Sequence, residues 1–168
     1  AAFGAVPGLT IAAPMNEPEL RNMMYTALGS GHPFMIRYPR GHGEGLPWRG
    51  EKFETLPVGR GRRLREGADV ALLTVGTVGN AAARAAGRAA AEGVSVAHYD
   101  LRFVKPLDEA LLDEVGRKFR RVVTVEDGSL RGGVGEAVAA FFNGRSYDVR
   151  VQRLGIGDEW VEHGTPGQ

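Results

Sequence analysis

The sequence predicts an α/β protein whose larger part is a mostly parallel sheet flanked by helices. Residues 70–75 form a continuous apolar run, which is typical of a strand buried on both faces of a parallel sheet. From that run onward, strand-like and helix-like patterns alternate, and this alternation favours parallel strands with helices on both faces. A separate strand–helix–strand pattern precedes it. We therefore predict a first part over residues 1–40, a linker over 41–57 and a second part over 58–168.

The first part is predicted to open with a strand over residues 9–13, which Pro14 ends. Asn16 is a good N-cap for the helix that follows, and Glu19 stands where it can complete a capping box. Residues 29–31 end the helix, and residues 34–38 form a second strand that Pro39 stops. One apolar helical face is predicted from the spacing of Leu20, Met23, Met24, Ala27 and Leu28.

The second part is predicted as four strands joined by three helices. The strands cover residues 70–75, 94–99, 122–125 and 149–154, and the helices cover residues 78–91, 107–119 and 136–142. Thr77 is expected to cap the first of these helices, while Asp108 and Glu109 stand favourably in the first turn of the second. Residues 41–57 combine glycine and proline with polar residues, which is typical of a linker.

Composition excludes several classes of function. The 168 residues carry a net charge of +1, so no global field attracts nucleic acid or an anionic membrane. The chain has no cysteine, which excludes a disulfide framework, a thiolate nucleophile and a cysteine metal site. Its longest apolar runs are far shorter than the roughly 20 residues of a membrane span. No signal pattern opens the chain, and we expect a cytoplasmic location.

Both ends of the sequence suggest a longer protein. The chain begins without methionine close to a predicted strand, and it stops at a predicted turn over residues 165–168. We expect both ends to be cuts through a larger protein. The alternative is that disordered terminal residues are absent from the sequence.

Arg40 is the strongest candidate for a ligand contact. It follows the end of a predicted strand, between Pro39 and Gly41, and open α/β sheets place ligand groups at strand ends. A guanidinium group binds phosphate through paired, charge-assisted hydrogen bonds. The alternative is an arginine that pairs with a surface carboxylate. Arg37 stands three residues earlier on the opposite face of the strand, and we interpret it as structural.

Two glycine-rich loops and one acidic pair are weaker candidates. Residues 76–79 lie between a strand and a helix, where phosphate can bind, but a tight turn is the favoured interpretation. Residues 132–135 could form an anion-binding nest, although close packing of a loop is favoured. Glu126 and Asp127 point to opposite faces of a strand, so we interpret residues 126–128 as a loop-anchoring or interface feature.

The remaining charged clusters carry no clear chemistry. No two histidines stand at zinc-binding spacing, so the sequence predicts no metal site on them; they are His32, His42, His98 and His163. Residues 60–65 are basic but lack interleaved aromatic residues, and we predict a solvated face rather than a nucleic-acid patch.

Several stretches together resemble one enzyme family. Residues 36–41 read I-R-Y-P-R-G and residues 102–108 read R-F-V-K-P-L-D, and these two motifs are quite specific. Further matching stretches cover residues 13–17, 19–27, 99–101, 123–128, 154–158 and 162–164. In this order they resemble the 1-deoxy-D-xylulose-5-phosphate synthases, which are transketolase-like enzymes. The resemblance spans nearly the whole chain.

The resemblance implies a thiamine-diphosphate-dependent synthase that condenses pyruvate with glyceraldehyde 3-phosphate and releases CO2. Residues 1–40 would end its pyrimidine-binding domain, and residues 58–168 would form its transketolase C-terminal domain. Arg40 matches the family arginine that grips the substrate phosphate, and Tyr38 in the same motif is assigned to substrate binding. Gly157 departs from the proline that the family usually has. The parent enzyme would be a homodimer.

The resemblance assigns no catalytic, cofactor-binding or metal-binding residue to this chain. The family's motif for diphosphate and Mg²⁺ is G-D-G with a later asparagine, and residues 126–128 read E-D-G instead. The isolated chain is therefore expected to be inactive. Two alternatives stay open: the β subunit of a 2-oxoacid dehydrogenase or a split transketolase, and a non-catalytic dimerisation or regulatory module.

Overall fold

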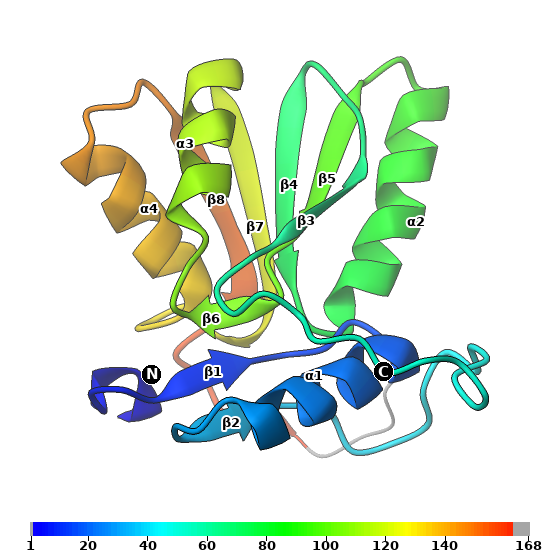
Figure 1. Ribbon diagram of the computed structural model, residues 1–168. Helices are drawn as coiled ribbons and strands as arrows, with labels where there is room; N and C mark the ends of the chain where they lie inside the picture. Colours follow the sequence, from blue (N-terminus) through cyan, green and yellow to red (C-terminus); the bar gives the residue numbers. More distant parts are fainter. Residues whose placement is uncertain (1, 163–168) are drawn as a thin grey trace.

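Two sheets organise the chain in the computed structural model, which describes residues 2–162 (Figure 1). Ala1 and residues 163–168, including His163 and the predicted terminal turn, lie outside the described residues. The strands are β1 (Thr10–Ala12), β2 (Phe34–Ile36), β3 (Arg62–Arg65), β4 (Val70–Val75), β5 (Val96–Asp100), β6 (Phe103–Lys105), β7 (Arg121–Ser129) and β8 (Arg150–Ile156). The helices are the 3₁₀ helix η1 (Ala2–Ala5), α1 (Glu17–Gly29), α2 (Val78–Ala91), α3 (Glu109–Lys118) and α4 (Val134–Gly144).

The larger sheet confirms the predicted fold class. Its strand order is β3-β5-β4-β7-β8, and β4 pairs in parallel with both β5 and β7, as β7 does with β8. Helix α2 covers one face of this sheet, while α3 and α4 cover the other (Figure 1). Strand β3 runs antiparallel at the edge beside β5, and the sequence did not predict it.

The two faces of the larger sheet are packed differently. On the side of α3 and α4, large side chains such as Leu73, Leu112 and Phe142 are fully buried. Burying a side chain of this size contributes about 1.5–3 kcal/mol relative to leaving it exposed. On the side of α2, Ala82 and Ala86 pack against the strands, and their small side chains allow the helix to lie close to the sheet.

The smaller sheet joins the two parts of the sequence. Its order is β2-β1-β6, with β1 parallel to β2 and antiparallel to β6. The sequence predicted β1 and β2 but not β6, which comes from the second part. The Lys105 ammonium group also donates to the carbonyl oxygens of Gly4 and Val6, at 2.9 and 2.6 Å. The smaller sheet is therefore completed by residues that follow the linker.

Helix α1 confirms one sequence prediction and corrects two. The Asn16 side chain accepts a hydrogen bond from the Glu19 backbone N–H at 3.1 Å, as an N-cap should. The predicted capping box is wrong, because the Glu19 carboxylate binds Arg102 instead. The predicted apolar face is wrong in part, since Met23 is fully buried but Met24 is 55% and Leu28 88% exposed. The buried side of α1 carries Glu19, Asn22, Met23 and Thr26.

Two further helix starts differ from the prediction in detail. Thr77 precedes α2, but it has helical backbone angles and its side chain makes no capping hydrogen bond. Asp108 is the N-cap of α3 rather than a first-turn residue, and its carboxylate accepts from the Leu111 backbone N–H at 3.1 Å. Within residues 2–162, no helix is both long and apolar enough to span a membrane.

Candidate functional site

A small crevice lies where the two parts of the chain meet. The parallel strands β4 and β7 are neighbours, but their connections leave β4 toward β5 on one side and β7 toward β8 on the other. Such a switch point is where open α/β sheets usually bind ligands, beyond the carboxyl ends of the strands. Here those ends contribute residues 75–77 and Asp127, and the first part covers them with Ala13 and residues 37–39.

The crevice is too small to enclose a phosphorylated sugar. Its volume is about 40 Å³, which is room for a few water molecules. The Arg37 guanidinium donates a hydrogen bond to the Asp127 backbone carbonyl and lies 3.9 Å from the Asp127 carboxylate. This contact supports the interpretation of Arg37 as structural, because it ties the end of β2 to the end of β7.

The predicted substrate-binding residues lie beside this crevice. Tyr38 lines it, although the side chain is 64% exposed. Arg40 lies two residues further on in an exposed segment, and it does not line the crevice. Among residues 2–162 its guanidinium has no hydrogen-bond or ion-pair partner. Gly41 follows with φ of 139°, a backbone conformation that L side chains rarely adopt.

The acidic pair at the end of β7 has a structural role. The Glu126 carboxylate accepts hydrogen bonds from the backbone N–H groups of Val134 and Gly135, at 3.0 and 2.9 Å. A Cβ atom on Gly133 would lie only 2.3 Å from the Ser129 carbonyl oxygen. The loop-anchoring interpretation and the close-packing interpretation are both confirmed, because the start of α4 receives a carboxylate from the protein itself.

Residues 76–79 form the predicted tight turn. Gly76 has φ of 79°, and the Gly79 backbone N–H donates to the Gly76 carbonyl at 3.0 Å. The same turn contacts the first part of the chain. The Asn80 side chain donates to the Met15 carbonyl at 2.8 Å, and a Cβ atom on Gly79 would lie 3.2 Å from the Met15 sulfur.

A buried cluster of charges holds α1 against the second part. The Arg102 guanidinium donates to both carboxylate oxygens of Glu19, at 2.7 and 2.8 Å. Arg62 lies 2.8 Å from Glu19 and 3.1 Å from Asp100, which is fully buried. Burial raises the pKa of Asp100, and the Arg62 charge opposes that rise. The predicted solvated face over residues 60–65 therefore holds for the exposed residues Arg63, Leu64 and Arg65. Arg62 is the exception, because its guanidinium joins this cluster.

This charge cluster is not visible in the local sequence pattern. Glu19 and Arg102 are separated by 83 residues, so no short-range spacing links them. Arg102 has φ of 56°, and its own backbone N–H donates to Asp100 at 3.1 Å. This backbone turn directs the side chain from the end of β5 toward α1.

His98 is a buried histidine with a hydroxyl partner. It is 1% exposed in the middle of β5, and its Nε2 lies 2.8 Å from the Thr74 hydroxyl oxygen. Burial lowers the pKa of His98 to about 4, because the charged imidazolium loses its hydration. Across residues 2–162, no group of three or more His, Asp or Glu side chains gathers where it could hold a metal ion.

Comparisons with known proteins agree with the resemblance seen in the sequence. Two curated relatives are 1-deoxy-D-xylulose-5-phosphate synthases. The one from Bacteroides thetaiotaomicron is 54% identical over 95% of this chain, and the one from Bacteroides fragilis is 52% identical over 97%. The chain spans about a quarter of the length of these relatives, at 25% of each.

A solved structure shares the fold. It is described as a split-gene transketolase in an inactive β4 tetramer, and its TM-score to this chain is 0.80 at 30% sequence identity. The similarity covers 92% of this chain and 50% of that one. Residues 59–168 match the family described as "Transketolase, C-terminal domain". This chain therefore belongs to the transketolase C-terminal domain family.

Proposed function

We propose that the chain is the C-terminal part of a 1-deoxy-D-xylulose-5-phosphate synthase. The observation that carries this proposal is the identity of about half of all residues, over nearly the whole chain, to proteins of that name. The parent enzyme would condense pyruvate with glyceraldehyde 3-phosphate and release CO2. Residues 1–40 would belong to its pyrimidine-binding domain, and the enzyme would be a cytoplasmic homodimer.

Arg40 would contribute the phosphate contact, with Tyr38 beside it. Its guanidinium has no partner among residues 2–162, so it is available to bind an anionic group through paired hydrogen bonds. The crevice that Tyr38 lines holds only about 40 Å³, so the substrate would lie outside it. The other walls of the substrate site would then come from portions of the parent enzyme outside this chain.

Thiamine diphosphate and Mg²⁺ would likewise be held outside this chain. Mg²⁺ prefers carboxylate and carbonyl oxygens together with phosphate groups. Within residues 2–162, acidic side chains are not grouped in a way that fits this preference. The Glu126 carboxylate at the start of α4 is already occupied by two backbone N–H groups. We therefore assign this chain no role in cofactor binding.

The proposal is tested by measuring CO2 release from pyruvate. The assay contains glyceraldehyde 3-phosphate, thiamine diphosphate and Mg²⁺, with either this 168-residue chain or the longer enzyme that contains it. We expect activity in the longer enzyme alone. Activity of the longer enzyme that transfers an acyl group to lipoamide, without needing glyceraldehyde 3-phosphate, would instead identify a 2-oxoacid dehydrogenase subunit. Activity in the 168-residue chain would contradict the assignment of the cofactor.

Arg40→Ala in the longer enzyme tests the site residue. We expect a higher KM for glyceraldehyde 3-phosphate and a nearly unchanged KM for pyruvate. Loss of a charged phosphate contact costs on the order of 2–4 kcal/mol of binding free energy. Arg88→Ala is the control, since Arg88 is also exposed but lies on α2. An Arg40→Ala enzyme with the KM of the Arg88→Ala enzyme would remove Arg40 from the substrate site.

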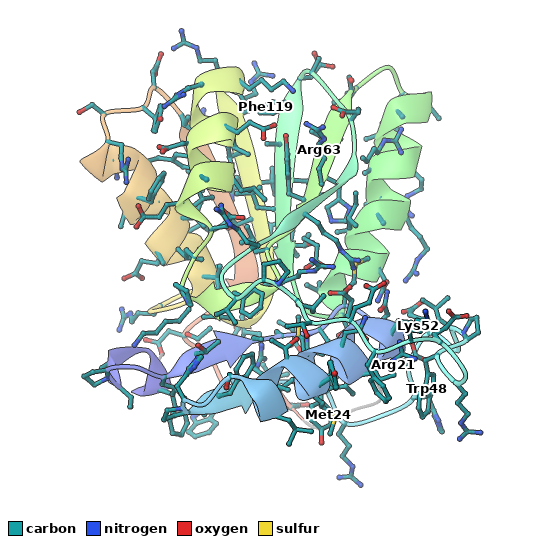
Figure 2. The ribbon with its side chains drawn as sticks, viewed as in Figure 1. Arg21, Met24, Trp48, Lys52, Arg63 and Phe119 are labelled. Atoms are coloured by element: carbon teal, nitrogen blue, oxygen red, sulfur yellow. The ribbon has the colours of Figure 1, made fainter. Side chains whose placement is uncertain are left out.

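A second candidate function is a non-catalytic assembly module. The observation that favours it is the outer side of α1, where Met24 and Leu28 expose apolar side chains. Figure 2 shows Met24 on this side of the helix. Exposed apolar side chains that adjoin one another can mark a surface that binds another protein. Light scattering of the 168-residue chain tests this candidate. A strictly monomeric chain would count against it.

A further inference from the structure

Polar side chains of α1 bind the backbone of the linker segment, residues 43–56. They form two pairs, Glu17 with Arg21 and Asn22 with Thr26, and the members of each pair are neighbours on the helix surface. The linker segment contains no helix or strand. Its backbone N–H and C=O groups therefore need partners elsewhere. Helix α1 supplies several of these partners along nearly its whole length.

Glu17 binds the start of the linker segment. Its Oε1 accepts a hydrogen bond from the Gly45 backbone N–H at 2.7 Å. The linker backbone lies so close to this carboxylate that a Cβ atom on Gly43 would be 2.2 Å from Oε1. The pKa of Glu17 is lowered, first by a hydrogen bond from its own backbone N–H and then by the N–H groups of residues 44–46, against an opposing effect of burial.

Arg21 binds the middle of the linker segment. Its guanidinium donates to the carbonyl oxygens of Trp48, Glu51 and Lys52, with the latter two at 3.1 and 2.6 Å. Figure 2 shows Arg21 pointing from α1 toward Trp48 and Lys52. The guanidinium also lies 4.9 Å from the centre of the Phe53 ring. One side chain thus binds three carbonyl groups of this irregular backbone.

Asn22 and Thr26 bind the end of the linker segment. The Asn22 side-chain oxygen accepts from the Glu54 backbone N–H at 3.3 Å, and the Thr26 hydroxyl accepts from the Leu56 backbone N–H at 2.8 Å. Leu56 itself is buried with Met23 in the core of the smaller sheet. The linker segment is therefore fixed to α1 at its start, its middle and its end, so its path is determined by the helix.

This arrangement has a consequence for Arg40. The residue lies between two fixed points, because β2 ends at Ile36 and the contact with Glu17 begins at Gly43. A ligand contact is most effective when its position is set before the ligand binds. We propose that Glu17 is a positioning residue for Arg40, which it serves by holding the chain that follows Arg40. This inference rests on the proposed function, because it requires Arg40 to bind the substrate phosphate.

Hydrogen exchange in the 168-residue chain tests the contact without any activity. Glu17→Ala removes the carboxylate. Gly43→Ala keeps the carboxylate but adds a Cβ that would lie 2.2 Å from its Oε1 and push it away from the linker backbone. We expect the amides of residues 43–46 to exchange about tenfold faster or more in both variants, since a charge-assisted hydrogen bond is lost. Glu66→Ala, which removes an exposed glutamate, should leave them unchanged. Unchanged exchange in both test variants would overturn the proposed contact.

Kinetics of the longer enzyme test the positioning role. Glu17→Ala should raise the KM for glyceraldehyde 3-phosphate about tenfold while the KM for pyruvate stays constant, and Glu17→Gln, which keeps one acceptor oxygen, should raise it less. The decisive variant is the double mutant with Arg40→Ala. If Glu17 acts through Arg40, the KM of the double mutant for glyceraldehyde 3-phosphate is no higher than that of Arg40→Ala alone. Additive effects, or equal effects on both substrates, would overturn the positioning role.

The two assays separate this inference from the proposed function. An Arg40→Ala enzyme with a normal KM would overturn the phosphate contact, and the positioning role with it. Faster amide exchange in the Glu17 variants would still establish that α1 fixes the linker segment. A normal exchange rate, together with a raised KM in Arg40→Ala, would uphold the proposed function and overturn the role of Glu17.

Discussion

Removing the Glu19 carboxylate should destabilise this protein severely. Glu19→Ala eliminates the two hydrogen bonds from Arg102, at 2.7 and 2.8 Å, and the contact with Arg62 at 2.8 Å. The Arg102 side chain is only 13% exposed, so its charge would be left buried without a partner, while Arg62 would keep Asp100. Removing one partner of a buried ion pair costs about 3–5 kcal/mol. The free energy of unfolding of an ordinary domain is about 5–15 kcal/mol, so this loss is a large share of the whole stability.

The assay is urea unfolding of the 168-residue chain followed by circular dichroism. Glu66→Ala is the matched control, because Glu66 also lies 2.8 Å from an arginine but is 70% exposed. An exposed pair of this kind contributes about 0–1 kcal/mol. We expect the two variants to differ by at least about 2 kcal/mol in the free energy of unfolding. If both variants lose the same free energy of unfolding, burial does not determine how much the charge cluster contributes to stability.

Three further predictions concern stability of the same chain. The free energy of unfolding should fall as pH decreases from about 6.5 through about 4, because the lowered pKa of buried His98 means that protonation favours the unfolded state. His98 should account for about 3 kcal/mol of this fall. In a series of urea midpoints measured against pH, His98→Asn should flatten this part of the curve. Gly133→Ala should lower the free energy of unfolding by about 1–3 kcal/mol or more, since the new Cβ would meet the Ser129 carbonyl oxygen at 2.3 Å. At Gly144 a Cβ meets nothing within 4 Å, so Gly144→Ala should be neutral or stabilising. Equal midpoints of the two variants in thermal unfolding would refute this difference. Glu126→Ala should cost about 2 kcal/mol and speed amide exchange at the first turn of α4, and unchanged exchange there would contradict its anchoring role.

The regular parts of the fold were predictable because their signals are local. Residues 70–75 were predicted as a buried strand, and β4 has the same bounds. A short, β-branched-rich apolar run of this length is typical of a strand that is buried on both faces of a sheet. Asn16 likewise caps α1 through a contact with a residue three positions away. Predictions of this kind depend on neighbours that the sequence itself displays.

The contacts between the two parts were not predictable, because each depends on distant residues. Strand β6 is only three residues long and pairs with β1, a strand from the opposite end of the linker. The position of Glu19, three residues after Asn16, indicates a capping box, but in the fold its carboxylate binds Arg102. The helix spacing of Met24 and Leu28 suggested a buried side, but the core lies on the side that carries Glu19 and Met23. The local sequence pattern of a helix does not determine which of its sides packs against residues from a distant part of the chain.

The site was predicted in part. The sequence placed Arg37 and Arg40 on different faces, and the structure gives Arg37 a protein partner while Arg40 has none among residues 2–162. Binding of residues 43–56 along α1 could not be predicted, because glycine and polar residues are equally typical of a flexible linker. The difference comes from side chains of α1 that bind backbone groups, and such contacts leave no pattern in the linker itself.

Strand β6 sets the order in which this protein can form during synthesis. Lys105 meets the carbonyl of Val6 across 99 residues of chain, and its strand completes the sheet of β1 and β2. A ribosome adds about 5–20 residues per second, so the first strands wait on the order of 5–20 seconds for their third member to be made. During that interval one edge of β1 is open to other chains. A rare-codon pause placed between β2 and β6 would lengthen this exposure, and a chaperone that binds extended segments would act on it first.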